Sequence, residues 1–215
     1  MKIKTIEKLQ NKLNADLAWR KKELTTIYFC LKNAEGKDEE VLGRSGIAIL
    51  YAHWEGFIKS SSQYYLLYIS SQKINVSSLK ENFLCLKLTA LNKKTTYMEN
   101  LCLIKKADIN SKSEFYLSEE KIETLIKAES NLKETVLVNI FQMLGLDYPD
   151  EFQTKKGIID TKLLNYRNHI VHGDKTEGLF DAKQAFFELK EVVLKLMDHF
   201  RDLIEEYSGK NKYKI

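Results

Sequence analysis

Apolar residues recur at intervals of three and four positions along much of the chain, which is the spacing of one face of an α-helix. Over about residues 1–33 the apolar stripe consists of Ile6, Leu9, Leu13, Leu17, Leu24, Ile27 and Leu31. We predict an amphipathic helix here, ended by Gly36, because glycine is a poor helix former. From about Glu39 to Ile69 the apolar and aromatic residues are too dense for one buried face, so a central helix is predicted there.

The middle of the chain is more polar and more broken. Shorter helices are predicted near residues 78–91, 97–107 and 118–128. Ser130 has the residue type of an N-cap, and the apolar pattern after it predicts a further helix that ends at Gly145.

Two more helices are predicted after a turn at residues 147–150. The first spans about residues 156–172 and is stopped by a glycine, and the last spans about residues 181–207. The lysine-bearing segment 209–215 is expected to be a frayed, flexible tail. No long linker interrupts the pattern, so residues 1–208 are predicted to form a single domain.

The composition agrees with an all-α fold. One proline and nine glycines in 215 residues leave few helix breakers, and 44% apolar with 30% charged residues is typical of a folded soluble protein. No apolar run reaches the roughly 18 residues of a membrane-spanning helix, and the first residues lack the apolar stretch of a signal peptide, so we expect a cytoplasmic protein without membrane contact. A net charge of +4 only weakly favours polyanionic partners.

Most catalytic signatures are missing from the sequence, including GxxxxGK(S/T), HExxH and GxSxG. The exception is the run from Tyr166 to Asp174, where two of the four histidines and an arginine lie within six residues at a helix end. On a helical wheel Arg167 falls inside the apolar arc, and His172 shares a side with Asn168 at its border. His169 points away, toward a solvated face. A guanidinium in such an arc requires a carboxylate partner or a wet cleft.

Two plainer interpretations of this run remain open. Ordinary capping or salt bridging would explain an arginine and a histidine on a helix, since a histidine in the last turn interacts favourably with the helix dipole. A metal site at His169 and His172 would need further ligands, for which Asp160 or Asp174 are the candidates.

The string Arg167-Asn168-His169-Ile170-Val171-His172 is an R-x4-H motif with a polar residue directly after the arginine. It resembles the signature of the HEPN superfamily (higher eukaryotes and prokaryotes nucleotide-binding domain). Its place late in an all-α chain, before one long final helix, fits this resemblance. The stretch at residues 52–59 also looks like the second helix of a bacterial HEPN branch linked to defence and toxin–antitoxin loci.

The resemblance implies an HEPN-like up-and-down helical bundle with extra helices. It further implies a homodimeric endoribonuclease that needs no metal or cofactor, with two R-x4-H motifs facing one cleft. Attack of a ribose 2′-OH on its own phosphate needs a proton acceptor, a cation and a proton donor. His172 suits the proton transfers, and Arg167 suits the phosphate oxygens. Asn168 would orient the imidazole ring or hold a phosphate oxygen.

Glu55 and Lys59 are expected to support this site or the helix that carries them. They are four residues apart, so they could form a surface ion pair, or Glu55 could be the carboxylate that orients Arg167. The aromatic residues of the second helix are interpreted as core or dimer interface rather than as a stacking surface for bases.

By its resemblance, the protein is expected to act on RNA as a toxin or an abortive-infection effector. A toxic enzyme needs restraint, so the family implies a cognate antitoxin, for which a minimal nucleotidyltransferase is one candidate. The alternative is a non-catalytic HEPN module that binds RNA, a nucleotide or a partner protein.

Overall fold

The computed structural model describes residues 3–91, 96–106, 113–126, 131–175 and 180–215. Every named element in these ranges is a helix, and the β contacts within them are two isolated bridges. The all-α prediction is therefore confirmed. Within the same ranges, no helix combines the length and the apolar character that crossing a lipid bilayer demands.

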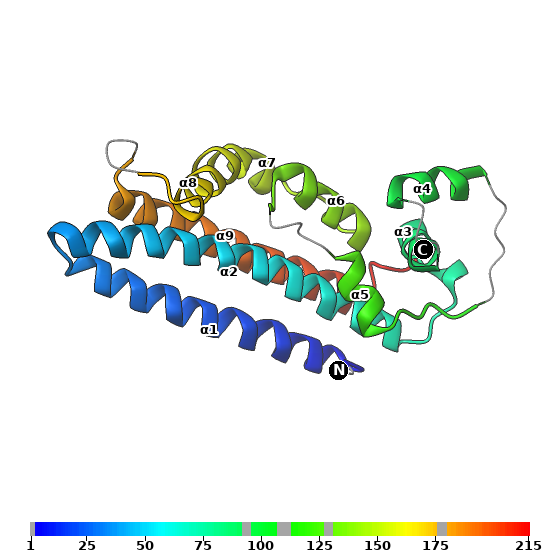
Figure 1. Ribbon diagram of the computed structural model, residues 1–215. Coiled ribbons are helices and arrows are strands. Elements are labelled where there is room, and N and C mark those ends of the chain that lie inside the picture. Colours follow the sequence, from blue (N-terminus) through cyan, green and yellow to red (C-terminus); the bar gives the residue numbers. More distant parts are fainter. Residues whose placement is uncertain (1–2, 92–95, 107–112, 127–130, 176–179) are drawn as a thin grey trace.

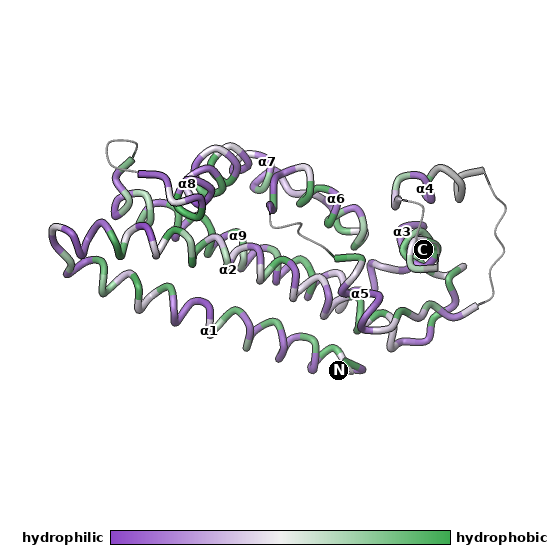
Figure 2. The backbone as a smooth tube through the Cα atoms, in the orientation of Figure 1, coloured by the Kyte–Doolittle hydropathy of each residue, from purple (hydrophilic) through white to green (hydrophobic). Residues whose placement is uncertain are grey.

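Three long helices run side by side and form the body of the molecule (Figure 1). They are α1 (Ile6–Lys32), α2 (Gly36–Ser71) and α9 (Ala182–Gly209). Each contacts the other two, so all three predicted long helices are confirmed. The prediction that Gly36 ends the first helix is wrong: α1 ends at Lys32, and Gly36 is the first residue of α2. In Figure 2 apolar and polar positions alternate along α1, as expected for a helix with one buried face.

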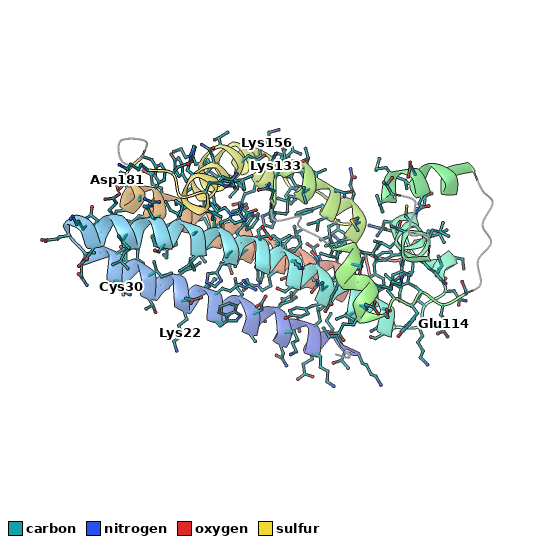
Figure 3. All side chains as sticks on the ribbon, viewed as in Figure 1. Lys22, Cys30, Glu114, Lys133, Lys156 and Asp181 are labelled. Carbon is teal, nitrogen blue, oxygen red and sulfur yellow. The ribbon has the colours of Figure 1, made fainter. Side chains whose placement is uncertain are left out.

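α2 is the central helix, as its sequence predicts. Its buried apolar residues point in several directions and include Ile47, Leu50, Tyr51, Trp54, Phe57 and Ile58. α1, by contrast, is covered on one side only. Figure 3 shows Lys22 and Cys30 of α1 pointing away from α2, and Cys30 is exposed.

A second layer of shorter helices covers α2 and α9 (Figure 1). It consists of α6 (Glu134–Leu144), α7 (Asp150–Gly157), the π-helical segment η2 (Ile158–Leu164) and α8 (Asn165–Val171). α6 ends as predicted at Gly145, whose φ of +68° is the left-handed conformation that favours glycine. The predicted N-cap, Ser130, lies outside the described residues.

The helix predicted over about 156–172 begins earlier than expected. Helical structure starts at Asp150, because Pro149 supplies a fixed φ just before the first turn and two acidic residues follow it. The run is also not one regular helix, since its middle is the π-helical segment η2. Sequence periodicity does not reveal such a change of helix type.

One end of the molecule is built from small helices: η1 (Val76–Ser78), α3 (Glu81–Leu91), α4 (Tyr97–Lys106) and α5 (Glu119–Leu125) (Figure 1). α3, α4 and α5 correspond to the three short helices predicted from the sequence. α3 packs against α6 and α5 packs against α2, which joins this end to the long helices.

The expectation of a frayed tail over residues 209–215 is wrong. Tyr213 is 2% exposed, and its backbone oxygen accepts a hydrogen bond from the Lys80 N–H at 3.1 Å. The Ile215 N–H donates to the Ser78 oxygen at 3.2 Å. The composition of the tail suggests solvation, but burial of one tyrosine ring and these backbone bonds hold it against η1 and α3.

The packing of α2 against α9 depends on a glycine. A Cβ atom at Gly43 would lie 2.9 Å from the Ala182 Cβ and 3.0 Å from the Ala182 carbonyl carbon, both closer than atoms normally approach. At Gly157, in contrast, a Cβ atom would meet nothing within 4 Å.

We expect Gly43→Ala to destabilise the protein by about 1–3 kcal/mol, because the added methyl group pushes α9 away from α2. Gly157→Ala should be neutral or stabilise by roughly 0.4–1 kcal/mol, since its backbone is already helical. Urea unfolding of both variants measures the difference. Equal stabilities of the two variants would contradict the close α2–α9 approach.

Candidate active site

Arg167 and Asn168 of the motif lie together on α8, the helix that packs against α2. The Arg167 Nη1 donates a hydrogen bond to the Asn168 Oδ1 at 2.9 Å. The Arg167 guanidinium carbon lies 4.6 Å from the centre of the Tyr51 ring of α2, which is a cation–π contact. Both motif residues are half-buried, which agrees with the predicted place of Asn168 at the border of the apolar arc, whereas Arg167 is predicted to lie inside the arc.

His172 is the C-cap residue of α8, and its side chain is exposed. Its backbone N–H donates to the Asn168 oxygen at 3.0 Å. Gly173 follows with a φ of +78° and ends the helix, as predicted. The imidazole has no hydrogen bond or ring contact with any other described residue, and Arg167 does not contact it within one chain.

His169 has a different environment. Its Nδ1 lies 2.8 Å from the Asp174 Oδ2, and the backbone oxygen of Asp174 accepts a hydrogen bond from the Arg44 Nη2 at 3.1 Å. The wheel is wrong for both histidines: His172, expected beside Arg167 at the border of the apolar arc, is exposed, and His169, expected to face solvent, is half-buried and paired with Asp174. It is also wrong for Val171, which it places in the apolar arc but which is 60% exposed, because the short α8 extends beyond the surface of α2 that it covers.

The residues considered for a metal site are engaged separately. Both carboxylate oxygens of Asp160 accept from the Glu134 backbone N–H, at 3.1 and 3.2 Å, at the start of α6. The Asp174 carboxylate pairs with His169. The part of the chain that the structure describes contains no group of three or more His, Cys, Asp or Glu side chains placed to hold a metal ion.

The motif histidine differs from the others in its partners. The chain has four histidines, and three of them lie beside a carboxylate. These pairs are His53 with Glu23 at 2.7 Å, His169 with Asp174 at 2.8 Å and His199 with Glu151 at 2.6 Å. Among the described residues, His172 alone of the histidines has no such carboxylate.

The arginines divide in the same way. Two of the four pair with aspartates: Arg20 with Asp16 at 3.2 Å, and Arg201 with Asp198 at 3.1 Å and Asp202 at 2.7 Å. Arg167 and Arg44 have no carboxylate within ion-pair distance in the described ranges; Arg167 belongs to the motif, and Arg44 contacts the backbone just after it. This end of α8 therefore presents un-neutralised nitrogen donors, which suits an anionic group such as a phosphate.

Glu55 and Lys59 do not behave as expected. No ion pair joins them in the described structure: Lys59 is exposed, and Glu55 is directed toward the Tyr51 hydroxyl. Within the same residues Glu55 also makes no direct ion pair with Arg167. Its Oε2 is sealed from solvent without a hydrogen-bond partner among the described residues. The predicted surface bridge is wrong because Glu55 lies on the inner face of α2.

Tyr51 is the residue of this site that sequence reasoning missed. It is buried, as a core aromatic should be, but its hydroxyl also accepts a hydrogen bond from the Leu132 N–H at 2.7 Å. Burial raises the pKa of the Tyr51 hydroxyl well above its usual value, and Glu55 raises it further. The available signal is its position one turn before Glu55, because residues four apart share a helix face.

The other polar residues of the 52–59 stretch serve the α1–α2 contact. The buried His53 places Nδ1 3.3 Å from the Arg20 Nη1 and Nε2 2.7 Å from Glu23. Burial lowers the pKa of His53, and Arg20 lowers it further, against the opposing effect of Glu23. A Cβ atom at Gly56 would lie 2.8 Å from the Arg20 Nη1, so the guanidinium fits here because residue 56 has no side chain.

An open, largely apolar groove of about 650 Å³ adjoins the motif. It lies between the first half of α2 and α8 and is lined by Lys37, Glu40, Val41, Arg44, Ser45, Ala48, Ile49 and Ile170. Val41 is 62% exposed. Exposed apolar side chains gathered beside a motif are typical of an interaction surface.

The contrast between the arginines predicts different effects on stability. Arg20→Ala should cost about 3–5 kcal/mol, because it leaves the buried Asp16 carboxylate without a compensating positive charge. Arg167→Ala should cost only about 0.5–1 kcal/mol, the value of an exposed cation–π contact. Thermal and urea unfolding test this, and an Arg167 variant as unstable as the Arg20 variant would favour a purely structural role for Arg167.

Comparison with known proteins bears on the identity of this site. The model of the HEPN_MAE_28990-like HEPN family matches residues 9–213, nearly the whole chain, whereas no curated protein and no solved structure gives a significant match. HEPN domains often bind RNA and form dimers. The matched range includes the motif, α2, α9 and all but the first three residues of α1, so the expected HEPN-like helical fold is confirmed, and the chain belongs to the HEPN superfamily.

Proposed function

We propose that the protein is a metal-independent HEPN endoribonuclease that works as a homodimer. The observation that carries this proposal is the electrostatic state of the motif. Among the described residues, Arg167 and His172 both lack the carboxylate partners that Arg20, Arg201 and the other histidines have. A phosphodiester is the anion that such a pair of donors suits.

The chemistry needs no group beyond the two motifs and the RNA. The ribose 2′-oxygen attacks the adjacent phosphorus while one His172 takes its proton. The bond from phosphorus to the 5′-oxygen then breaks, and the His172 of the second copy protonates that oxygen. The products are a 2′,3′-cyclic phosphate and a 5′-hydroxyl. Arg167 stabilises the charge on the phosphorane oxygens, and Asn168 fixes the Arg167 guanidinium through its Oδ1.

Two features support a homodimer around the motif. His172 is exposed and out of contact with Arg167 within one chain, so a second copy is the simplest way to bring a histidine to each phosphate. The groove beside α8 also contains both signs of charge, with Glu40 opposed by Lys37 and Arg44. A two-fold arrangement could pair these groups across the interface while covering Val41.

The biological role that we propose is that of a toxin or abortive-infection effector that cuts cellular or phage RNA. The bacterial HEPN branch that the motif and the 52–59 stretch resemble supports this role. An active ribonuclease of this kind requires restraint. We therefore propose a cognate antitoxin or a minimal nucleotidyltransferase as partner, which would act by denying RNA access to the exposed His172.

The catalytic proposal is tested on total RNA in excess EDTA. We expect the wild type to cut and His172→Ala to lose at least about a hundredfold in rate, in the range that loss of general acid–base catalysis gives. His169→Ala is the matched control and should retain most activity, because its ring is tied to Asp174. RNA binding without cleavage by the wild type would instead support the non-catalytic binding module.

The dimer is tested by placing a charge in the groove. Val41→Glu should shift the protein toward monomer in sedimentation analysis and lower RNase activity in parallel, because it buries a carboxylate in an apolar contact. Phe29→Glu is the control, since Phe29 is similarly exposed, at 56%, but lies on α1. A dimer that survives Val41→Glu would place the interface elsewhere.

A further inference from the structure

Two arginines of this protein rest on aromatic rings in nearly the same way, yet their settings differ. The Arg20 guanidinium lies 4.7 Å from the centre of the Trp19 ring, and that of Arg167 lies 4.6 Å from the centre of the Tyr51 ring. Arg20 is buried and is also bound to Asp16. Arg167 has the ring and the Asn168 Oδ1, and among the described residues it has no acid.

The Tyr51 ring is a rigid support. It is 2% exposed within the α2 core, and its hydroxyl is held at 2.7 Å by the N–H of Leu132, itself fully buried. Glu55, one turn later on α2, contributes to the raised pKa of the same hydroxyl. The ring is thereby attached to α2 through its backbone and to the segment before α6 through its hydroxyl.

The support is also electrically neutral. A tyrosine hydroxyl is protonated at physiological pH, and burial raises the pKa of Tyr51 further. A neutral ring attracts a guanidinium through the negative face of its π-system. The positive charge of Arg167 is therefore held in place without being cancelled, whereas an aspartate, as at Arg20, would both hold it and offset it.

We propose that Tyr51 is a positioning residue for Arg167: its ring face fixes the guanidinium plane so that the outward N–H groups are directed at the scissile phosphate. This inference rests on the proposed ribonuclease function. Tyr51 does not touch the reacting atoms and acts only through Arg167. The Leu132 N–H acts one step further back, by holding the phenol.

Substitutions of graded effect separate positioning from folding. Tyr51→Phe keeps the ring and should retain kcat within about threefold. Tyr51→Leu removes the ring and should lower kcat roughly tenfold to a hundredfold with little change in KM, as expected for a misplaced group acting in the transition state. Replacement of Tyr51 by 3,4,5-trifluorophenylalanine keeps the shape but weakens the π-face, so its kcat should lie between the two, even if the leucine variant folds poorly.

A matched control exists elsewhere in the protein. The Lys190 Nζ lies 4.9 Å from the centre of the Tyr28 ring, on the α1–α9 side of the molecule. Tyr28→Leu should therefore leave kcat unchanged at equal protein stability. If Tyr28→Leu and Tyr51→Leu lower kcat equally, or if the fluorinated and phenylalanine variants have the same kcat, the positioning proposal is overturned.

A second measurement needs no RNA. In the ¹H–¹⁵N spectrum of the full chain, the Arg167 Nε–H signal, assigned with Arg167→Lys, should be shifted by the ring current in the wild type and in Tyr51→Phe, and should lose that shift in Tyr51→Leu. An unshifted Arg167 signal in the wild type overturns the proposal. If the wild type cuts no RNA but the ring-current shift is present, the proposed ribonuclease function is wrong. The contact that positions Arg167 on the Tyr51 ring is then still supported.

Discussion

The burial of α2 on several faces is the constraint on which the rest of this structure depends. α1 and α9 cover it on one side, and α6, η2 and α8 pack on the other. The size and shape of each buried side chain of α2 must therefore fit the helices that pack on both sides of it. Gly43 allows the approach of α9, Gly56 makes room for Arg20, and Tyr51 fills space toward α8. The motif is positioned by α8, which packs on the closely packed α2.

The chain uses one type of side chain for two purposes. Arg20 forms a buried and fully compensated contact with Asp16 that joins polar groups at the α1–α2 interface. Arg167 is held by an aromatic face and an amide and keeps its charge for a ligand. The same division separates His53 from His172. Arginine and histidine side chains thus serve both stability and the proposed catalysis. Those with a neighbouring carboxylate stabilise the fold, and those without one are available to a ligand.

Much of the fold could be predicted from the sequence, because the long helices carry strong periodic signals. Gly145 and Gly173 end helices as predicted, since their positive φ values favour glycine. The π-helical turn and the docked Tyr213 leave no mark on the apolar periodicity, so they could not be predicted from it. The early start at Asp150 does have local signals, Pro149 and the acidic first turn, but the apolar periodicity does not reach it. In the candidate site, the local pairing of Arg167 with Asn168 follows from adjacency. The contact of Arg167 with Tyr51 joins segments that are distant in the sequence, so the spacing of apolar residues within either helix does not indicate it.

The order of the long helices along the chain has a kinetic consequence. α1 and α2 are joined by a short turn at Ala34, so their hairpin can form from contacts between sequence neighbours. α9 packs on the same pair but follows all the intervening helices, so its docking must close a long loop and carries the corresponding entropic cost. Such non-local contacts raise the contact order and slow folding. We therefore expect the hairpin to form early and the docking of α9 to be the slower event that completes the core beneath the motif.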